Sequence, residues 1–160
     1  SEIQGPCYVR LGRLAAEDVY TDENFHFEFG KGNVLQEGKD VVVIASGYMV
    51  QQTLGALEAL KANGIEPTVI DIHTIKPIDK ELITASAKKT GKVVTVEEHS
   101  IIGGLGSAVC EALAETVPTP VLRIGVQDVF GESGPAKALI AKYGLDAESI
   151  YKKVKEYLAK

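Results

Sequence analysis

The stretch that most constrains the fold lies at residues 92–114, KVVTVEEHSIIGGLGSAVCEALA. It begins with an apolar run at residues 93–96, typical of a short strand buried on both faces, and continues into three polar residues at positions 97–99. A glycine-rich turn follows at residues 103–106, and from Ser107 the apolar residues have helical spacing. A strand, a polar tip, a glycine turn and a helix in this order place functional groups at the carboxyl edge of a parallel sheet.

Strands and helices alternate along most of the remaining chain. Apolar runs predict four parallel strands, centred at Val43, Val69, Val94 and Leu122. Helical spacing and stop signals predict helices over residues 49–62, 80–89, 107–116, 136–143 and 147–158. Residues 33–36 are interpreted as an antiparallel edge strand. We therefore predict a three-layer α/β/α sandwich with a mixed five-stranded sheet, four strands parallel and one antiparallel at an edge.

Residues 1–32 do not follow this pattern. A short alternating strand at residues 7–11 is followed by Gly12, and an acidic, aromatic stretch then leads to Gly32. Because a single strand needs a sheet to join, we expect residues 1–32 to be the end of another domain plus a linker. Residues 33–160 form the second predicted unit.

Charge and composition limit the classes of partner that the chain is expected to bind. The net charge of −5 argues against nucleic acid, because binding phosphates requires clustered Lys and Arg side chains. No apolar run reaches the length of a membrane span, and we expect neither a signal peptide nor a membrane partner. The two cysteines, Cys7 and Cys110, are far apart and are interpreted as reduced thiols. We expect a cytoplasmic location.

Two glycine-containing turns are candidate anion sites or interface contacts. Bare backbone amides at a helix amino terminus can hold an anion. The residues concerned are Ser46, Gly47, Gly103, Gly104 and Gly106. For the turn at residues 103–106, the alternative is that the glycines only form a tight turn and let a helix pack closely on a strand, and we favour this second interpretation.

The polar tip carries the remaining candidates, Glu98 and His99. A carboxylate beside an imidazole can perform general acid–base catalysis. No nucleophile is recognisable next to them, and the three histidines are too far apart in the sequence to predict a metal site. We interpret both residues as edge or interface contacts, and the sequence assigns no catalytic residue and no metal ligand.

Arg13 follows the short strand and a glycine, so its side chain should emerge at the strand end. A guanidinium there suits a phosphate or carboxylate through paired hydrogen bonds. An ordinary surface arginine is the alternative interpretation.

Three motifs together carry a family resemblance. The segments DIHTIKPID (71–79), VEEHSIIGGLGSAV (96–109) and GPAKALIAKYGLDAESI (134–150) resemble the carboxyl-terminal part of transketolase. The opening GPCYVRLGR (5–13) resembles the end of the pyrimidine-binding domain of that family. The likeness covers essentially the whole chain and is greatest to the split form of bacteria and archaea, which is made as two polypeptides.

The resemblance implies an enzyme with thiamine diphosphate and Mg²⁺ or Ca²⁺ that transfers a two-carbon ketol unit between sugar phosphates in the pentose phosphate pathway. In the family, the first domain holds the diphosphate and metal, and the middle domain holds the aminopyrimidine. We therefore expect no cofactor on this chain and no activity from it alone. The implied partners are an amino-terminal transketolase portion and a second copy, giving a homodimer of the complete enzyme. Arg13 matches the family's substrate-phosphate arginine.

Other assignments stay open. Deoxyxylulose-phosphate synthase and the beta subunit of 2-oxo acid dehydrogenases share the domain, although the sequence motifs DIHTIKPID and EEH favour transketolase. A stand-alone module that binds a small anion, or a regulatory module, is the alternative from a different class.

Overall fold

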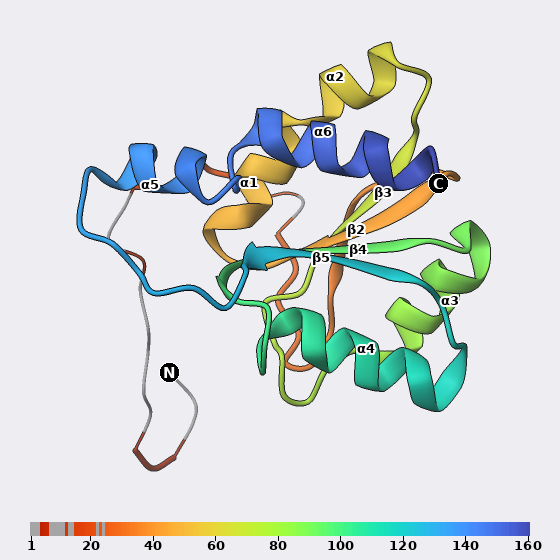
Figure 1. Ribbon diagram of the computed structural model, residues 1–160. Coiled ribbons are helices and arrows are strands. Elements are labelled where there is room, and N and C mark those ends of the chain that lie inside the picture. The colour runs from red at the N-terminus through yellow and green to blue at the C-terminus, as the bar shows by residue number, and fades with distance from the viewer. Residues whose placement is uncertain (1–3, 7–11, 13–14, 22, 24) are drawn as a thin grey trace.

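The computed structural model describes residues 4–6, 12, 15–21, 23 and 25–160, so Cys7 and Arg13 lie outside the described residues. Five strands form one sheet, and helices cover both of its faces (Figure 1). The strands are β1 (Asn33–Gln36), β2 (Val41–Ala45), β3 (Pro67–Asp71), β4 (Val93–Ser100) and β5 (Val121–Val126). The helices are α1 (Tyr48–Gly55), α2 (Leu57–Ala62), α3 (Lys80–Thr90), α4 (Leu105–Thr116), α5 (Ala136–Lys142) and α6 (Ala147–Leu158).

The order of the strands in the sheet is β1-β3-β2-β4-β5. Strand β1 is antiparallel to β3, and the other neighbouring pairs are parallel. The four predicted strand centres lie in one row, because Val43 pairs with Val69 on one side and Val94 on the other, and Val94 pairs with Leu122. The predicted mixed sheet with one antiparallel edge strand is confirmed.

Strand β2 shows why the sheet has two covered faces. All five of its residues are buried, and alternate side chains point to opposite faces. Val41, Val43 and Ala45 belong to the core shared with α1 and α6. Val42 and Ile44 belong to the core shared with α3 and α4. Burial of each valine or isoleucine contributes about 1.5–3 kcal/mol to stability. Because helices cover the core on each face of the sheet, the chain forms the predicted three-layer sandwich.

The predicted helix at residues 49–62 is wrong in its continuity, because the structure has two helices, α1 and α2, separated at Ala56. The amide of Ala56 donates to the carbonyl of Thr53 at 3.1 Å, a three-residue closure that interrupts the α-helical ladder. The break lies beside α6, since a Cβ on Gly55 would lie 3.2 Å from Cβ of Ala147. Apolar spacing alone does not reveal this break.

The boundaries around the organising stretch also differ from the prediction. Strand β4 includes residues 97–99 and continues to Ser100, with a register irregularity in its pairing with β5 after Val96. Helix α4 begins at Leu105, two residues before the predicted start at Ser107. Gly106 therefore lies in the first turn of a helix and is not part of the turn that precedes it.

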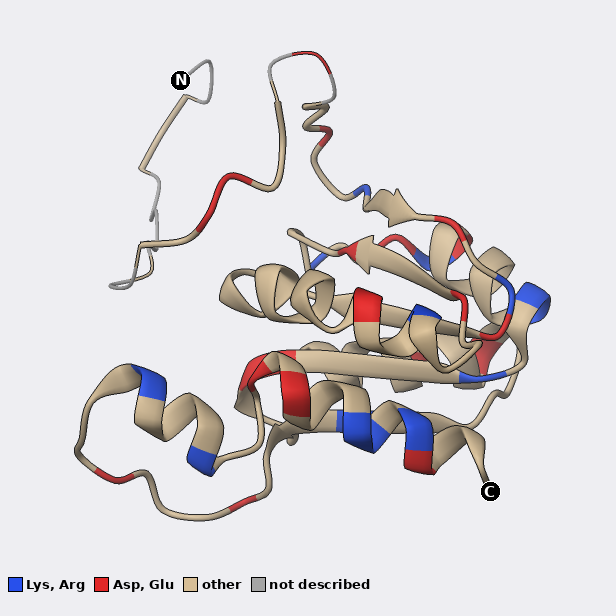
Figure 2. Cartoon of the chain, turned by 90° about the horizontal axis from the view of Figure 1, so that it is seen from above, with Lys and Arg blue, Asp and Glu red and all other residues tan. Residues whose placement is uncertain are grey.

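Charged residues of both signs lie on α2, α3 and α6, whereas α1 carries none (Figure 2). Acidic residues also occur on the described part of the segment before β1 and where β4 ends. No helix among the described residues is long and apolar enough to cross a membrane.

Candidate functional site

The carboxyl ends of β2, β3 and β4 form the edge where the predicted site residues gather. Glu97 is the central group on β4. It is only 2% exposed, and its carboxylate accepts hydrogen bonds from the amides of Leu105 at 2.7 Å and Gly106 at 2.8 Å. The carboxylate thereby binds two backbone amides in the first turn of α4 that have no partner within the helix. It also places a negative charge at the amino terminus of α4, which is the positive end of the helix dipole.

The glycines of this turn make room for that contact. A Cβ on Gly104 would overlap the carboxylate of Glu97. A Cβ on Gly106 would lie 2.9 Å from both Cδ of Arg123 and Oγ1 of Thr95. The amide of Gly103, which has a φ of 75°, donates to Oγ of Ser107 at 2.9 Å. The first-turn amides at positions 105 and 106 therefore bind an internal carboxylate, and we place no external anion on them.

His99 lies next to this contact without forming an acid–base pair. Its Nδ1 is 2.7 Å from the carbonyl oxygen of Ser100, so Nδ1 donates and carries a proton. The same nitrogen is 3.9 Å from Oε2 of Glu97, whose oxygens already accept backbone amides. The imidazole is half exposed at the sheet edge. This position agrees with the predicted edge contact, whereas the interface role stays a prediction.

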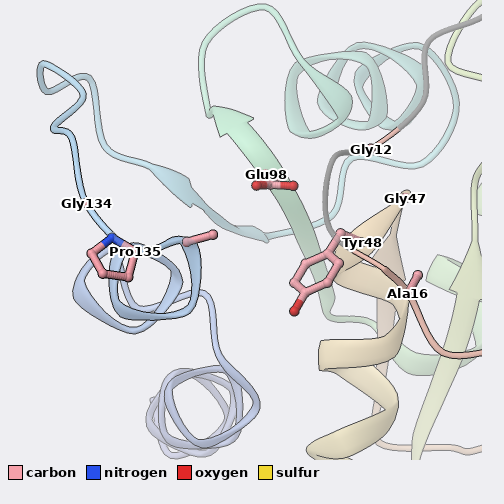
Figure 3. Close-up of a pocket in the computed structure, with 8 residues that line it drawn as sticks. Gly12, Ala16, Gly47, Tyr48, Glu98, Gly134 and Pro135 are labelled. Carbon is pink, nitrogen blue, oxygen red and sulfur yellow. The ribbon is translucent and has the colours of Figure 1, made fainter.

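A cavity of about 650 Å³ brings two other predicted residues together (Figure 3). Glu98, at the end of β4, lies with Pro135 on one side and Tyr48 on the other. Gly47, which precedes α1 with a φ of 56°, is part of the same wall. The described lining residues are Gly12, Ala16, Gly47, Tyr48, Glu98, Gly134, Pro135 and Ala136. Ser46 is not among them.

Sequence reasoning missed a second polar cluster, at the carboxyl end of β3. The hydroxyl of Tyr20 donates to Oδ2 of Asp71 at 2.6 Å. Burial, together with this hydrogen bond, raises the pKa of Tyr20 to about 12. Burial also raises the pKa of the Asp71 carboxyl, and the Tyr20 hydroxyl partly opposes that rise. The only signal in the sequence is an aspartate inside the apolar run PTVIDI.

No group of three His, Cys, Asp or Glu side chains within the described ranges is arranged to hold a metal ion. The α4 amides that could approach a diphosphate donate to Glu97 instead.

Comparison with known proteins places the chain in a family. The sequence pattern of the transketolase C-terminal domain matches residues 30–150. A protein of Methanocaldococcus jannaschii that is named as a transketolase C-terminal section is 48% identical over 162 residues, which cover 100% of this chain and 50% of that protein. One of the subunits of the apulose-4-phosphate transketolase of Phocaeicola vulgatus is 44% identical over 155 residues, covering 97% of this chain and 49% of that polypeptide.

The domain also occurs in deoxyxylulose-phosphate synthases. The 1-deoxy-D-xylulose-5-phosphate synthase of Caldanaerobacter subterraneus is 43% identical over 146 residues, which cover 91% of this chain and 24% of that enzyme.

A solved structure agrees with both the sequence and the fold. A split gene transketolase, described as an inactive β4 tetramer, superposes with a TM-score of 0.91 and 51% identity. The match covers 99% of this chain and 52% of the solved one. This chain thus spans about half the length of the transketolase sections and subunits that it matches. On the family match and these identities, the chain belongs to the transketolase C-terminal domain family.

Proposed function

We propose that this chain is the carboxyl-terminal part of a split transketolase, an enzyme that transfers a two-carbon ketol unit between sugar phosphates. The observation that carries the proposal is the 51% identity to a split gene transketolase over 99% of the chain. A likeness of this extent makes a shared role in a composite enzyme the simplest explanation.

The chain's own contribution is structural and substrate-binding. Residues 33–160 form the packed unit, and residues 1–32 are the end of the pyrimidine-binding domain with its linker. The half-exposed His99 and the cavity beside Glu98 belong to the surface that meets the rest of the enzyme. Arg13 binds the substrate phosphate in the assembled enzyme, which works in the cytoplasm in the pentose phosphate pathway.

Thiamine diphosphate and Mg²⁺ or Ca²⁺ belong to the other portion of the enzyme in this proposal. When bound there, the cofactor supplies the carbon centre that carries the ketol unit. The assembled enzyme is a homodimer of complete units. The isolated chain is expected to lack activity, in keeping with the relative that is described as an inactive tetramer.

An activity assay tests the proposal. The chain is measured alone and mixed with the amino-terminal portion that supplies the first and middle domains, with cofactor, Mg²⁺, a ketose phosphate donor and an aldose phosphate acceptor. Ketol transfer only in the mixture supports the composite enzyme. Transfer by the chain alone contradicts it, because the proposal places the cofactor on the other portion of the enzyme.

The deoxyxylulose-phosphate synthase assignment remains the second candidate, because a synthase of that name is 43% identical. The same mixture is therefore also examined for 1-deoxy-D-xylulose 5-phosphate. Formation of that product without ketol transfer would replace the transketolase assignment.

A further inference from the structure

All four phenylalanines of the chain are exposed. Their exposed fractions range from 59% for Phe25 and Phe27, through 69% for Phe29, to 98% for Phe130. Phenylalanine is among the residues most often buried in folded proteins, yet none of the four belongs to either core of this chain. The chain therefore carries apolar surface that its own described residues do not cover.

Three of these rings lie beside the carboxyl end of β3. The ring of Phe27 is 4.7 Å, centre to centre, from the imidazole of His73, which comes two residues after that strand. Phe25 packs edge-on against Tyr20 at 5.6 Å, and the Tyr20 hydroxyl binds the last residue of β3. Phe29 lies two residues further along the same segment. These three phenylalanines form a first apolar patch.

A second apolar patch lies where β4 and β5 end. Ile102 comes two residues after β4, Val129 and Phe130 come three and four residues after β5, and all three are exposed. The described loops at the opposite edge of the sheet carry no exposed large apolar residue; they are residues 37–40, 63–66, 91–92 and 117–120. The remaining exposed large apolar residues of the described chain are Ile75, in the loop after β3, and Val34, on the outer strand β1. Exposed apolar surface is thus concentrated at the carboxyl edge.

The backbone that carries Phe130 is tied to the end of α5. The hydroxyl of Tyr143 donates to the carbonyl oxygen of Phe130 at 3.4 Å, and Nζ of Lys142 donates to Oε2 of Glu132 at 2.6 Å. An aromatic ring on a backbone held in this way loses little conformational freedom when a partner covers it, and aromatic residues are enriched in protein interfaces. Phe130 therefore has the properties of an interface anchor.

The segment before β1 indicates what covers this edge. Gly12 and Ala16 line the cavity of about 650 Å³ beside Glu98, and the loop that carries Phe130 leads into Pro135 in the wall of the same cavity. Figure 1 shows the described N-terminal residues on the side of the sheet to which the arrowhead of β5 points. In the proposed function, Gly12 and Ala16 belong to the end of the pyrimidine-binding domain and its linker. Because a chain spans at most about 3.6 Å per residue, the rest of that domain lies within short reach of this cavity.

We propose that the two patches form one docking surface, which the pyrimidine-binding domain of the amino-terminal portion covers, with Phe130 as the anchor. This inference rests on the proposed function and adds to it the occupant of the carboxyl edge. The facing surface of that domain is apolar, because the residues that it covers are aromatic and aliphatic. A second copy of this chain is the alternative occupant.

The test is ¹⁹F NMR of the whole chain produced with 4-fluorophenylalanine, which labels only the four phenylalanines. Single substitutions to leucine assign the four signals. Relaxation by a soluble gadolinium chelate then measures the exposure of each ring, first in the chain alone and then in an equimolar mixture with the unlabelled amino-terminal portion, thiamine diphosphate and Mg²⁺. We expect the relaxation of the Phe130 signal to fall about fivefold or more in the mixture, because the ring leaves the solvent.

Substitution K88F supplies the matched control, because it adds a fifth labelled ring on the exposed last turn of α3. The relaxation of that fifth signal should be the same in the chain alone and in the mixture. Substitution F130A should weaken binding of the amino-terminal portion about tenfold or more, whereas K88F should leave the affinity unchanged. Because the Phe130 ring is exposed in the isolated chain, F130A should not change the free energy of unfolding.

The outcomes separate this inference from the proposed function. Ketol transfer in the mixture with undiminished relaxation at Phe130 overturns the docking surface and leaves the composite enzyme standing. Protection of Phe130 that increases with the concentration of the chain alone assigns the surface to a second copy and also overturns the inference. If the two portions do not bind each other, the proposed function fails, and the docking surface fails with it.

Discussion

Glu97 and Gly104 share one space: the buried carboxylate of Glu97 fills the volume that any side chain at position 104 would need. The absence of a side chain at position 104 lets the carboxylate reach the amides of Leu105 and Gly106. This contact joins the end of β4 to the start of α4, and it holds in place the edge that carries Glu98 and His99.

Substitution G104A should destabilise the chain by about 2–4 kcal/mol, because the new methyl group displaces the carboxylate and leaves buried groups unpaired. Urea unfolding measures the loss. The control is G131A, where a Cβ would meet nothing within 4 Å, and it should change the unfolding free energy by less than about 0.5 kcal/mol. Equal effects of the two substitutions would refute the shared-space account.

Substitution E97Q tests the charge at almost unchanged volume. The NH2 group of glutamine is a hydrogen-bond donor and would face a backbone amide that is also a donor. The negative charge at the helix terminus is lost as well. We therefore expect the free energy of unfolding to fall by about 2–3 kcal/mol. Its neighbour supplies the control, since E98Q changes an exposed residue and should be nearly neutral. If E97Q unfolds at the wild-type urea concentration, Glu97 does not stabilise α4.

Alkaline pH should lower the free energy of unfolding, because Tyr20 loses its proton there. Its pKa is about 12 in the folded chain against 10.0 ordinarily, so the folded state keeps the proton where the unfolded state loses it. The stabilisation is complete below pH 10 and is lost as the pH rises from 10 to 12. Because Tyr20 is partly exposed, we expect a change of about 1 kcal/mol.

The variant Y20F isolates this effect. The difference in unfolding free energy between wild type and Y20F should shrink between pH 10 and pH 12, while other groups titrate equally in both. A difference that stays constant over this range would show that Tyr20 does not titrate as the Asp71 contact requires.

Substitution R13A, made in the complete enzyme, tests the proposed paired contact between the Arg13 guanidinium and the substrate phosphate. If Arg13 forms that contact, its loss should raise the KM for phosphorylated sugars about tenfold or more. Steady-state kinetics with phosphorylated and unphosphorylated acceptors measure the effect. Unphosphorylated acceptors should be nearly unaffected. Equal losses on both kinds of acceptor would remove the phosphate-binding role from Arg13.

The sheet could be predicted because each of its parallel strands is marked by a short run of apolar residues in the sequence. The runs around Val43, Val69, Val94 and Leu122 are continuous and apolar, and strands buried on both faces require this pattern. The starts of two helices, at residues 80 and 147, were also predicted from the sequence. Asp79 and Asp146 both cap helices, accepting the amides of Leu82 at 3.1 Å and Ser149 at 3.0 Å.

The features that escaped prediction depend on residues that meet only in the folded chain. The early start of α4 follows from a carboxylate eight residues before Leu105 that lies on a neighbouring element. The contact between Tyr20 and Asp71 joins residues that are 51 positions apart. Neither pairing leaves a periodic trace in the sequence, so composition and spacing cannot reveal it.

The most direct test of the account is a titration of ketol-transfer activity. A fixed amount of the amino-terminal portion, with thiamine diphosphate and Mg²⁺, is mixed with increasing amounts of this chain. We predict no transfer by this chain alone and activity that rises and saturates at equal molar amounts. Transfer by this chain without its partner, or no transfer at any ratio despite formation of a complex, would contradict the assignment to a composite transketolase.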